Sequence, residues 1–501
     1  MPVNRRRFLK YAGATVAAVG VSAIGLEYLV GPKLANVTES RRTSTSSTAT
    51  IIPPQIVNFR WQPTRVVNDK VYDAILSFDV QGSEPISSLN ATLDTYAPTI
   101  PAGAYPEEPP RNLQFNKSPS SETLSTQVTD LKGGKYYEAT VQATDAAGHQ
   151  ASAQFETPYV REFENTAKGA GINIGAYYYP WYNSTSWWDD REKPKGTPLL
   201  GYYTNDFTYI SQKQSEIVVS KHIDWSTGHK IGKWLSSWWG PSSRSGAALK
   251  RIFANPLISD IDIGIVYEGD GLLKSNQNRW DLNDGGYNRS QLTSHMDYFA
   301  TNCFPSPHYW KINGRCVVYY YYSRSFIGDL EGAFGQLRDI AQNHGYKLFI
   351  IGDEMGDNRN WDSPSNWSSS RLKLYDGMTN YLALPGGFPV TTQDYKKVNV
   401  TNDNYANVLS SYLAEWSTAT RNLGIKLIPF ACPGYNTVNA SEKTLLRDIA
   451  RFKERLNTAK TYVDPDIKTL MITTFSEWFE GTRVEPGTDD GFATLDCIRE
   501  T

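Results

Sequence analysis

The chain has few of the residues that bind metals or form disulfides. Its 501 residues include six histidines and four cysteines, without H-E-x-x-H or C-x-x-C spacing. Those spacings bring imidazole or thiolate ligands to one ion, so we expect no catalytic metal and no other cofactor. The formal net charge is −2, which gives no support to a nucleic-acid partner held by bulk electrostatics.

Aromatic residues, in contrast, are abundant. They make up 13% of the chain, with 14 tryptophans and 31 tyrosines. Such side chains fill protein cores, and their faces also cover the C–H surfaces of sugars. A chain of 501 residues is too long for one ordinary domain. The composition therefore predicts more than one folded unit and is compatible with a sugar ligand.

The N-terminus resembles an export signal. The pattern R-R-x-F-L-K at residues 5–10 is typical of twin-arginine signals, and an apolar stretch follows over residues 11–30. This stretch is long enough to span a bilayer, so residues 1–31 predict a cleaved signal or a membrane anchor. We expect a monomer that is secreted or anchored to the outer face of the cytoplasmic membrane. Export permits disulfides, and the sequence leaves open whether Cys303 and Cys316 pair.

Two further segments precede the largest part of the chain. Residues 32–54 are rich in Ser and Thr and end near two prolines, which predicts a flexible linker. In residues 55–165, short runs such as KVYDAILSFDV (residues 70–80) alternate apolar and polar positions, as half-buried antiparallel strands do. This part resembles a small fibronectin type III or immunoglobulin-like sandwich. We interpret it as a spacer, with a carbohydrate-binding module as the alternative.

Residues 166–501 alternate apolar, strand-like runs with amphipathic segments of helical period. The eight runs are 172–179, 231–239, 261–268, 315–322, 347–354, 374–381, 425–434 and 468–477. Eight β-α alternations predict a (β/α)8 TIM-like barrel, whose buried parallel strands are nearly continuous in apolar residues. A doubly wound open sheet is the alternative.

The C-terminal ends of these runs carry aromatic side chains and carboxylates. In a barrel those ends form one rim, where the active site lies. We expect the rim to contain Tyr178, Tyr179, Trp181, Tyr182, Trp238, Trp239, Glu268, Glu354, Tyr435, Glu477, Trp478 and Glu480. One of the two neighbouring tryptophans, 238 or 239, should be core, and at most half of Tyr319–Tyr322 can face a ligand because strand side chains alternate. Aromatic faces beside carboxylates predict glycoside hydrolysis.

Several motifs resemble the signatures of glycoside hydrolase family 99, the endo-α-mannosidases and endo-α-mannanases. They are GAYYYPWY, SSWWGPSSRSG, YWKINGRCVVYYY, FACPGYN and TTFSEWFEGTRVEP, within residues 172–486. The resemblance implies a barrel, no metal, and retention of configuration through attack by the sugar's own 2-hydroxyl. By position, Glu477 would be the base on that hydroxyl and Glu480 the acid/base. Ser476 and Phe479 depart from the residues common in the family.

Two other functions stay open. A hydrolase could combine Glu477 with Glu268 or Glu354, because carboxylates on separate strands can be spaced for a direct nucleophile. A cell-surface protein could instead bind glycans on the same aromatic rim without turnover. Hydrolysis of α-mannosides, and its response to Glu477→Gln, would separate these possibilities.

Overall fold

A computed structural model gives the fold. It describes residues 52–68, 70–95, 109–117, 123–182, 196–203, 212–277, 279–356, 361–381, 401–436 and 445–501. The export signal at residues 1–31 and nearly all of the linker lie outside these residues, so both stay predictions. Within the described ranges, no helix is both long and apolar enough to cross a membrane. The chain divides into two compact units, the first ending at Glu164 and the second running from Asn165 to Thr501.

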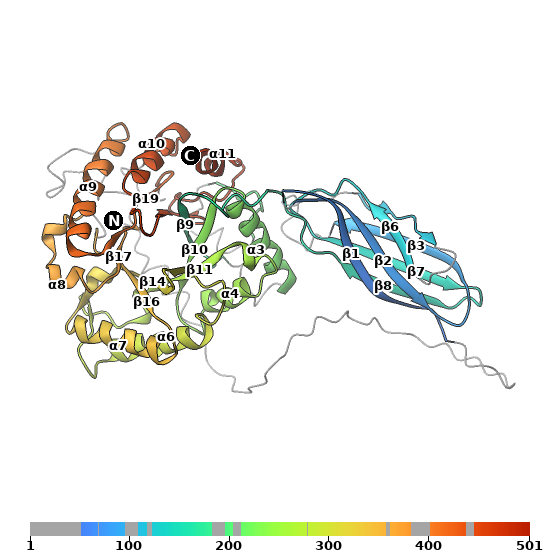
Figure 1. Ribbon diagram of the computed structural model, residues 1–501, viewed down its shortest axis with the longest axis horizontal. Helices are drawn as coiled ribbons and strands as arrows, with labels where there is room; N and C mark the ends of the chain where they lie inside the picture. Colours follow the sequence, from blue (N-terminus) through green and yellow to red (C-terminus); the bar gives the residue numbers. More distant parts are fainter. Residues whose placement is uncertain are drawn as a thin grey trace. The chain divides into compact units, whose positions relative to one another are not determined.

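The N-terminal unit contains two antiparallel four-stranded sheets (Figure 1). Their orders are β1-β2-β6-β5 and β4-β3-β7-β8. The strands are β1 Gln55–Val67, β2 Lys70–Gln81, β3 Ile86–Thr95, β4 Arg111–Asn112, β5 Asn116–Lys117, β6 Thr123–Val128, β7 Tyr137–Asp145 and β8 Gln150–Glu156. The alternating runs therefore form antiparallel strands, as predicted.

The core of this unit takes side chains from both sheets. Leu76 of β2, Leu93 of β3 and Ala139 of β7 belong to one buried cluster. On β2, Ala74, Leu76 and Phe78 are fully buried because alternate side chains point to the same face. The fibronectin III or immunoglobulin-like assignment stays a prediction.

The C-terminal unit contains a curled parallel sheet in the order β18-β17-β16-β14-β11-β10-β9-β20-β19. All neighbours along this path are parallel. The strands are β9 Asn173–Tyr178, β10 Ile231–Trp238, β11 Asp262–Glu268, β14 Arg315–Tyr321, β16 Leu348–Gly352, β17 Gly377–Met378, β18 Lys426–Leu427, β19 Phe430–Ala431 and β20 Thr469–Ile472. Each predicted run contains at least one of them. Short strands β13 (Lys311–Ile312), β12 (Trp280–Asp281) and β15 (Phe326–Ile327) flank this sheet.

The seventh run forms two strands because Pro429 interrupts it. Proline lacks a ladder N–H, yet its carbonyl accepts from Met471 N at 2.9 Å. On the other side, Ile428 N donates to Met378 O at 2.8 Å. Residues 426–431 thus supply both end strands of the sheet order, β18 and β19, which pair with β17 and β20. This arrangement is that of a TIM-like barrel and not of a doubly wound open sheet.

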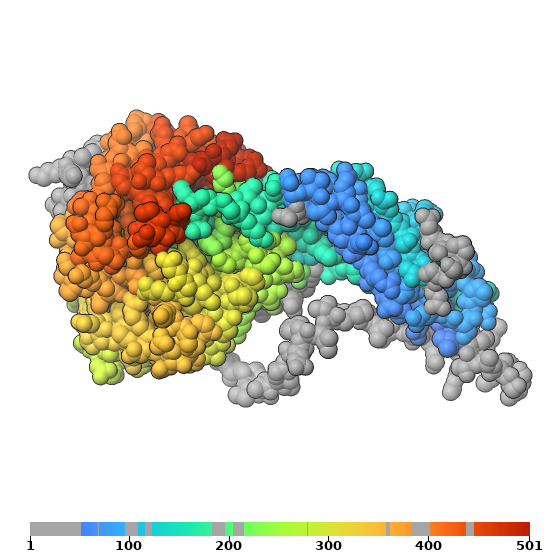
Figure 2. Space-filling view, viewed as in Figure 1, coloured from blue at the N-terminus to red at the C-terminus, as the bar shows by residue number. Residues whose placement is uncertain are grey.

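Helices surround the strands of this unit (Figure 1). They are α3 Gln212–Thr227, α4 Arg244–Phe253, α5 Gly269–Leu272, α6 Tyr287–Asn302, α7 Leu330–Asn343, α8 Ser369–Leu372, α9 Tyr405–Leu423, α10 Ile449–Lys460 and α11 Ala493–Glu500. On α7, Ala333, Phe334 and Leu337 are buried at the spacing of one helix face. Inside the sheet, a Cβ on Gly264 would lie 3.3 Å from the Trp310 ring, so glycine lets that ring fill the interior. In the space-filling view of Figure 2, the coloured atoms of this unit form a continuous packed surface on the face that is shown.

All four cysteines are buried free thiols: Cys303, Cys316, Cys432 and Cys497. The structure therefore has no Cys303–Cys316 disulfide. Burial raises the pKa of the Cys303 and Cys432 thiols to about 12. Thiols that stay protonated and inaccessible behave as small apolar side chains.

Candidate active site

Three tyrosine rings meet where β9, β14 and β17 end. The Tyr381 ring lies 6.2 Å from the Tyr179 ring and 5.3 Å from the Tyr321 ring, centroid to centroid. Tyr177, inside the barrel, packs edge-on against Tyr381 at 5.1 Å. These residues come together because the C-terminal ends of parallel strands share one edge of the sheet.

Two tryptophans extend this cluster toward β10. The Trp181 ring lies 4.4 Å from the Tyr179 ring and 6.4 Å from the Trp239 ring. Trp239 Nε1 donates to Ser237 Oγ at 2.9 Å, and that hydroxyl donates to Glu268 Oε1 at 2.8 Å. The carboxylate at the end of β11 is thereby connected to the rings beside β9. We call Tyr179, Trp181, Trp239, Tyr321 and Tyr381 the aromatic rim.

Glu480 joins the aromatic rim through Tyr381. The Tyr381 hydroxyl donates to Glu480 Oε2 at 2.6 Å, and Asn436 N donates to the backbone oxygen of Glu480 at 2.7 Å. A phenol this close to a carboxylate forms a short, charge-assisted hydrogen bond. Because Glu480 is only partly buried, it combines a fixed donor with contact to solvent.

Glu477 has different surroundings. It is 3% exposed, and its Oε1 accepts from the backbone N–H of Phe479 at 3.1 Å. Its own N–H donates to Thr474 Oγ1 at 2.9 Å. Burial, and then the charge of Glu477, raise the pKa of the Tyr182 phenol well above its ordinary value. One loop therefore supplies a buried carboxylate held by the backbone and a partly exposed one held by a phenol. Different environments allow two carboxylates to take different roles.

The loop is attached to the segment that follows β9. The Tyr182 hydroxyl donates to Ser476 O and accepts from Trp478 N at 3.1 Å. Tyr179 N donates to Ser476 Oγ at 3.1 Å, and the Phe479 ring stacks 6.0 Å from the Tyr182 ring. Ser476 and Phe479, the two departures from the family pattern, thus both help to hold this loop.

Two predicted rim residues face the helix layer instead. The Tyr178 hydroxyl lies 3.0 Å from Nδ1 of His222 on α3, and its ring stacks on Trp234 at 4.1 Å. Trp238 is fully buried against α6, with its ring 4.6 Å from Phe299. Trp238 is therefore the core member of the tryptophan pair.

Two others lie off the aromatic rim as defined here. Trp478 is fully buried behind the loop, where its Nε1 donates to Glu485 Oε2 at 2.7 Å. Tyr435 is partly exposed and pairs through its backbone with Leu445. These positions leave the roles proposed for both residues as predictions.

Glu354, the carboxylate predicted at the end of β16, is fully buried in the packing outside the sheet. It accepts from Arg371 Nε at 3.0 Å and from the Tyr375 hydroxyl at 2.6 Å. Its neighbour Asp353 pairs with Arg324 at 3.1 Å, and burial raises the Asp353 pKa despite that arginine. Glu268 is therefore the carboxylate from another strand that contacts the rim network.

Sequence reasoning did not single out Tyr321 and Tyr381 as site residues. Each lies at the end of a predicted run, which is the signal that could have identified them. The predicted alternation is confirmed, because Tyr319 packs near Tyr177 inside the barrel whereas Tyr320 packs on Phe334 of α7.

The sequence matches no protein-family model and none of the curated proteins compared with it. A solved family 99 endo-α-mannosidase from Bacteroides thetaiotaomicron, in complex with BIS-TRIS-propane, is 16% identical with a TM-score of 0.46, over 66% of this chain and 96% of that one. A Bacteroides ovatus GH5 xyloglucanase in complex with a XXXG heptasaccharide is 8% identical with a TM-score of 0.31, over 85% and 95%. Similarity at this level assigns no function to this chain.

Proposed function

We propose that the protein is a glycoside hydrolase whose active site is the aromatic rim together with Glu477 and Glu480. The observation that carries this proposal is the loop after β20. It holds one buried carboxylate, Glu477, on its own backbone, and three residues later it presents a partly exposed carboxylate, Glu480, to the Tyr381 phenol of the rim. Aromatic faces bind the pyranose, and the two carboxylates divide the proton transfers of glycoside cleavage.

In the proposed mechanism, Glu477 takes the proton of the sugar 2-hydroxyl. The 2-oxygen then attacks the anomeric carbon while Glu480 protonates the departing oxygen, and a 1,2-anhydro sugar forms as the glycosidic bond breaks. Glu480 next deprotonates a water that opens this ring, and Glu477 returns its proton to the 2-oxygen. Two inversions give net retention. Because the sugar supplies the nucleophile, two carboxylates from one loop suffice.

The finer features of the proposal rest on sequence motifs. The element TTFSEWFEGTRVEP and the motifs at the ends of the first, second and seventh runs favour an endo-acting enzyme on α-mannosidic glycans. The R-R-x-F-L-K pattern at residues 5–10 favours an exported enzyme, secreted or membrane-anchored.

The test is hydrolysis of a panel of α-mannosides and α-glucosyl-mannosides, with product configuration followed by NMR. We expect release of a disaccharide or longer product with retained configuration, and loss of activity in Glu477→Gln and Glu480→Gln. Glu354→Gln is the matched control, because that carboxylate is buried away from the rim, and it should keep the activity. Binding of these glycans without cleavage by the wild type would favour a glycan-binding protein instead.

A second hydrolase mechanism is favoured by one observation, the contact of Glu268 with the rim through Ser237. In that mechanism Glu268 and Glu477 act from separate strands, and one of them attacks the sugar directly. Activity that survives in Glu480→Gln but disappears in both Glu268→Gln and Glu477→Gln would assign catalysis to this second pair. A covalent glycosyl-enzyme detected by mass spectrometry would support the same conclusion.

A further inference from the structure

A buried carboxylate that the proposed mechanism does not use lies behind the catalytic loop. Glu485 is fully buried, and its two oxygens accept three hydrogen bonds. The donors are His222 Nε2 at 3.0 Å, the Tyr203 hydroxyl at 2.8 Å and Trp478 Nε1 at 2.7 Å. These donors come from α3, from the segment 196–203 and from the loop itself. A buried carboxylate is costly unless it is bonded in this way.

The network continues from His222 to β9. A neutral imidazole has one donor and one acceptor nitrogen. With Nε2–H directed at Glu485, Nδ1 is the acceptor that lies 3.0 Å from the Tyr178 hydroxyl. The indole of Trp478 is thereby connected, through one carboxylate and one imidazole, to a barrel strand.

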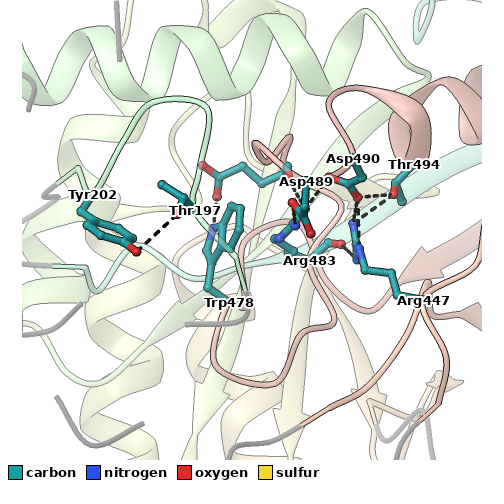
Figure 3. Close-up of polar contacts among 9 residues, drawn as sticks. Thr197, Tyr202, Arg447, Trp478, Arg483, Asp489, Asp490 and Thr494 are labelled. Atoms are coloured by element: carbon teal, nitrogen blue, oxygen red, sulfur yellow. Dashed lines mark hydrogen bonds and ion pairs between the residues drawn. The ribbon is translucent and has the colours of Figure 1, made fainter. Parts of the chain in front are cut away.

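The face of the same indole is also fixed. The Arg483 guanidinium lies 3.9 Å above the Trp478 ring, which is a cation–π contact. Figure 3 shows Arg483 beside Asp489 and Asp490, which it contacts at 2.5 and 3.0 Å. Arg447 approaches Asp490 at 2.5 Å from another side (Figure 3). Burial alone would raise the pKa of Asp490, but the two arginines hold it below its ordinary value.

We propose that Glu485 and Arg483 are positioning residues that fix Trp478 by its edge and by its face, and so orient the two glutamates. Trp478 stands between Glu477 and Glu480 in the sequence, so a shift of the backbone at an unfixed Trp478 would displace both. Displacements of about 1 Å can cost a hundredfold in rate, which makes a rigid support valuable. The catalytic consequence rests on the proposed function, whereas the fixing of the indole does not.

Two substitutions of Glu485 separate bonding from charge. In Glu485→Gln, the amide oxygen still accepts from Trp478 and Tyr203, and the amide N–H donates to His222 once that imidazole takes its other tautomer. We expect kcat to stay within about threefold of the wild type. Glu485→Ala removes the acceptor shared by three buried donors and with it the bond that fixes the edge of the indole, so kcat should fall about a hundredfold with little change in KM.

Trp478→Phe provides an independent variant, because it removes the indole donor, with part of the buried ring, and keeps a phenyl ring under Arg483. We expect kcat to fall about tenfold. The double variant Glu485→Ala with Trp478→Phe should be no slower than Glu485→Ala alone, since both act through one bond. Glu354→Ala is the matched control: it removes an equally buried carboxylate from the Arg371 and Tyr375 network, and it should lower stability without changing the kcat of the folded enzyme.

Hydrogen exchange at the Trp478 indole N–H and at the Phe479 amide gives a readout that needs no substrate. Both should be protected in the full-length wild type and in Glu354→Ala, and both should exchange faster in Glu485→Ala. Unchanged protection in Glu485→Ala would overturn the proposal, as would kcat within twofold of the wild type in both Glu485→Ala and Trp478→Phe. If Glu485→Ala does not fold, the test rests on Trp478→Phe, through its kcat and the hydrogen-exchange rate of its Phe479 amide. If the wild type cleaves no glycan, the proposed function fails and the exchange data alone decide the positioning.

Discussion

Removing the phenol that holds Glu480 should slow catalysis while leaving the fold intact. Tyr381 is 2% exposed, and its ring packs against Tyr177, Tyr179 and Tyr321. Phenylalanine keeps this packing. Tyr381→Phe therefore deletes the 2.6 Å hydrogen bond to Glu480 Oε2.

The size of the effect follows from the kind of bond lost. A hydrogen bond to a charged group contributes about 1.5–3 kcal/mol, and each 1.4 kcal/mol changes a rate about tenfold. Because Glu480 changes charge during the proposed reaction, a donor fixed at Oε2 acts on the transition state and not only on the bound substrate. We expect kcat/KM to fall roughly 10- to 150-fold, mostly in kcat.

The assay is the initial rate of cleavage of whichever α-mannoside the wild type hydrolyses, with the melting temperature measured in parallel. Tyr320→Phe is the matched control, because Tyr320 adjoins Tyr321 on β14 but packs against Phe334 outside the sheet. It should leave the rate unchanged. A Tyr381→Phe enzyme within twofold of the wild type would refute the role of this phenol. A loss of rate that tracks a lower melting temperature would indicate a packing defect instead.

Three further results are expected. Glu268→Gln keeps an acceptor for Ser237 but removes a negative charge from the rim side of the barrel. The melting temperature should therefore stay unchanged in a thermal scan, while kcat/KM falls at least about tenfold. An unchanged rate would exclude a catalytic role for that charge. Burial lowers the pKa of His295 from 6.5 to about 4, so between these pH values the unfolded state binds a proton that the folded state does not. The free energy of unfolding should therefore fall by up to about 3 kcal/mol as the pH is lowered from 6.5 to 4. Urea unfolding of His295→Gln should show a smaller fall in the free energy of unfolding over the same pH range. A pH dependence equal to that of the wild type would contradict the prediction. Four thiols should react with a thiol reagent after unfolding without reductant and almost none before, since all are buried and free; fewer than four after unfolding would reveal a disulfide.

The strands could be predicted because each carries its own signal. Parallel strands buried on both faces are continuous in apolar residues, and all eight runs contain strands. The break in the seventh run was not predicted, although its signal is Pro429, which cannot donate to a ladder. The sequence could not predict which way the side chains at the strand ends point. Tyr178 and Tyr179 are adjacent, yet the first packs on His222 of α3 and the second on Trp181 of the rim.

The sequence likewise could not show which of two adjacent carboxylates faces the rim. Asp353 and Glu354 are neighbours at the end of β16, and the prediction chose Glu354 for the rim. The structure directs Glu354 to Arg371 outside the sheet and Asp353 to Arg324. Period-two alternation states that neighbours differ but not which one faces inward, because the phase depends on pairing with the adjacent strands. Residues predicted from a loop motif, such as Glu477 and Glu480, do not depend on this phase.

The surroundings of the loop explain why two glutamates three residues apart can be held in different ways. On one side, Tyr381 and Asn436, from the segments that follow β17 and β19, bind Glu480 through its carboxylate and its backbone. On the other side, Tyr182, from the segment after β9, binds the backbone of Ser476 and Trp478 on both sides of Glu477. One half of the loop is thus attached to the segments that follow β17 and β19, and the other half to the segment that follows β9. A change on one side should therefore disturb one carboxylate more than the other, and Tyr182→Phe should impair steps that depend on Glu477 more than those that depend on Glu480.

A glycoside with an activated leaving group, which needs little help from an acid, allows the two variants to be compared. It should restore the rate of Tyr381→Phe but not that of Tyr182→Phe, and equal restoration in both would show that the loop moves as one body.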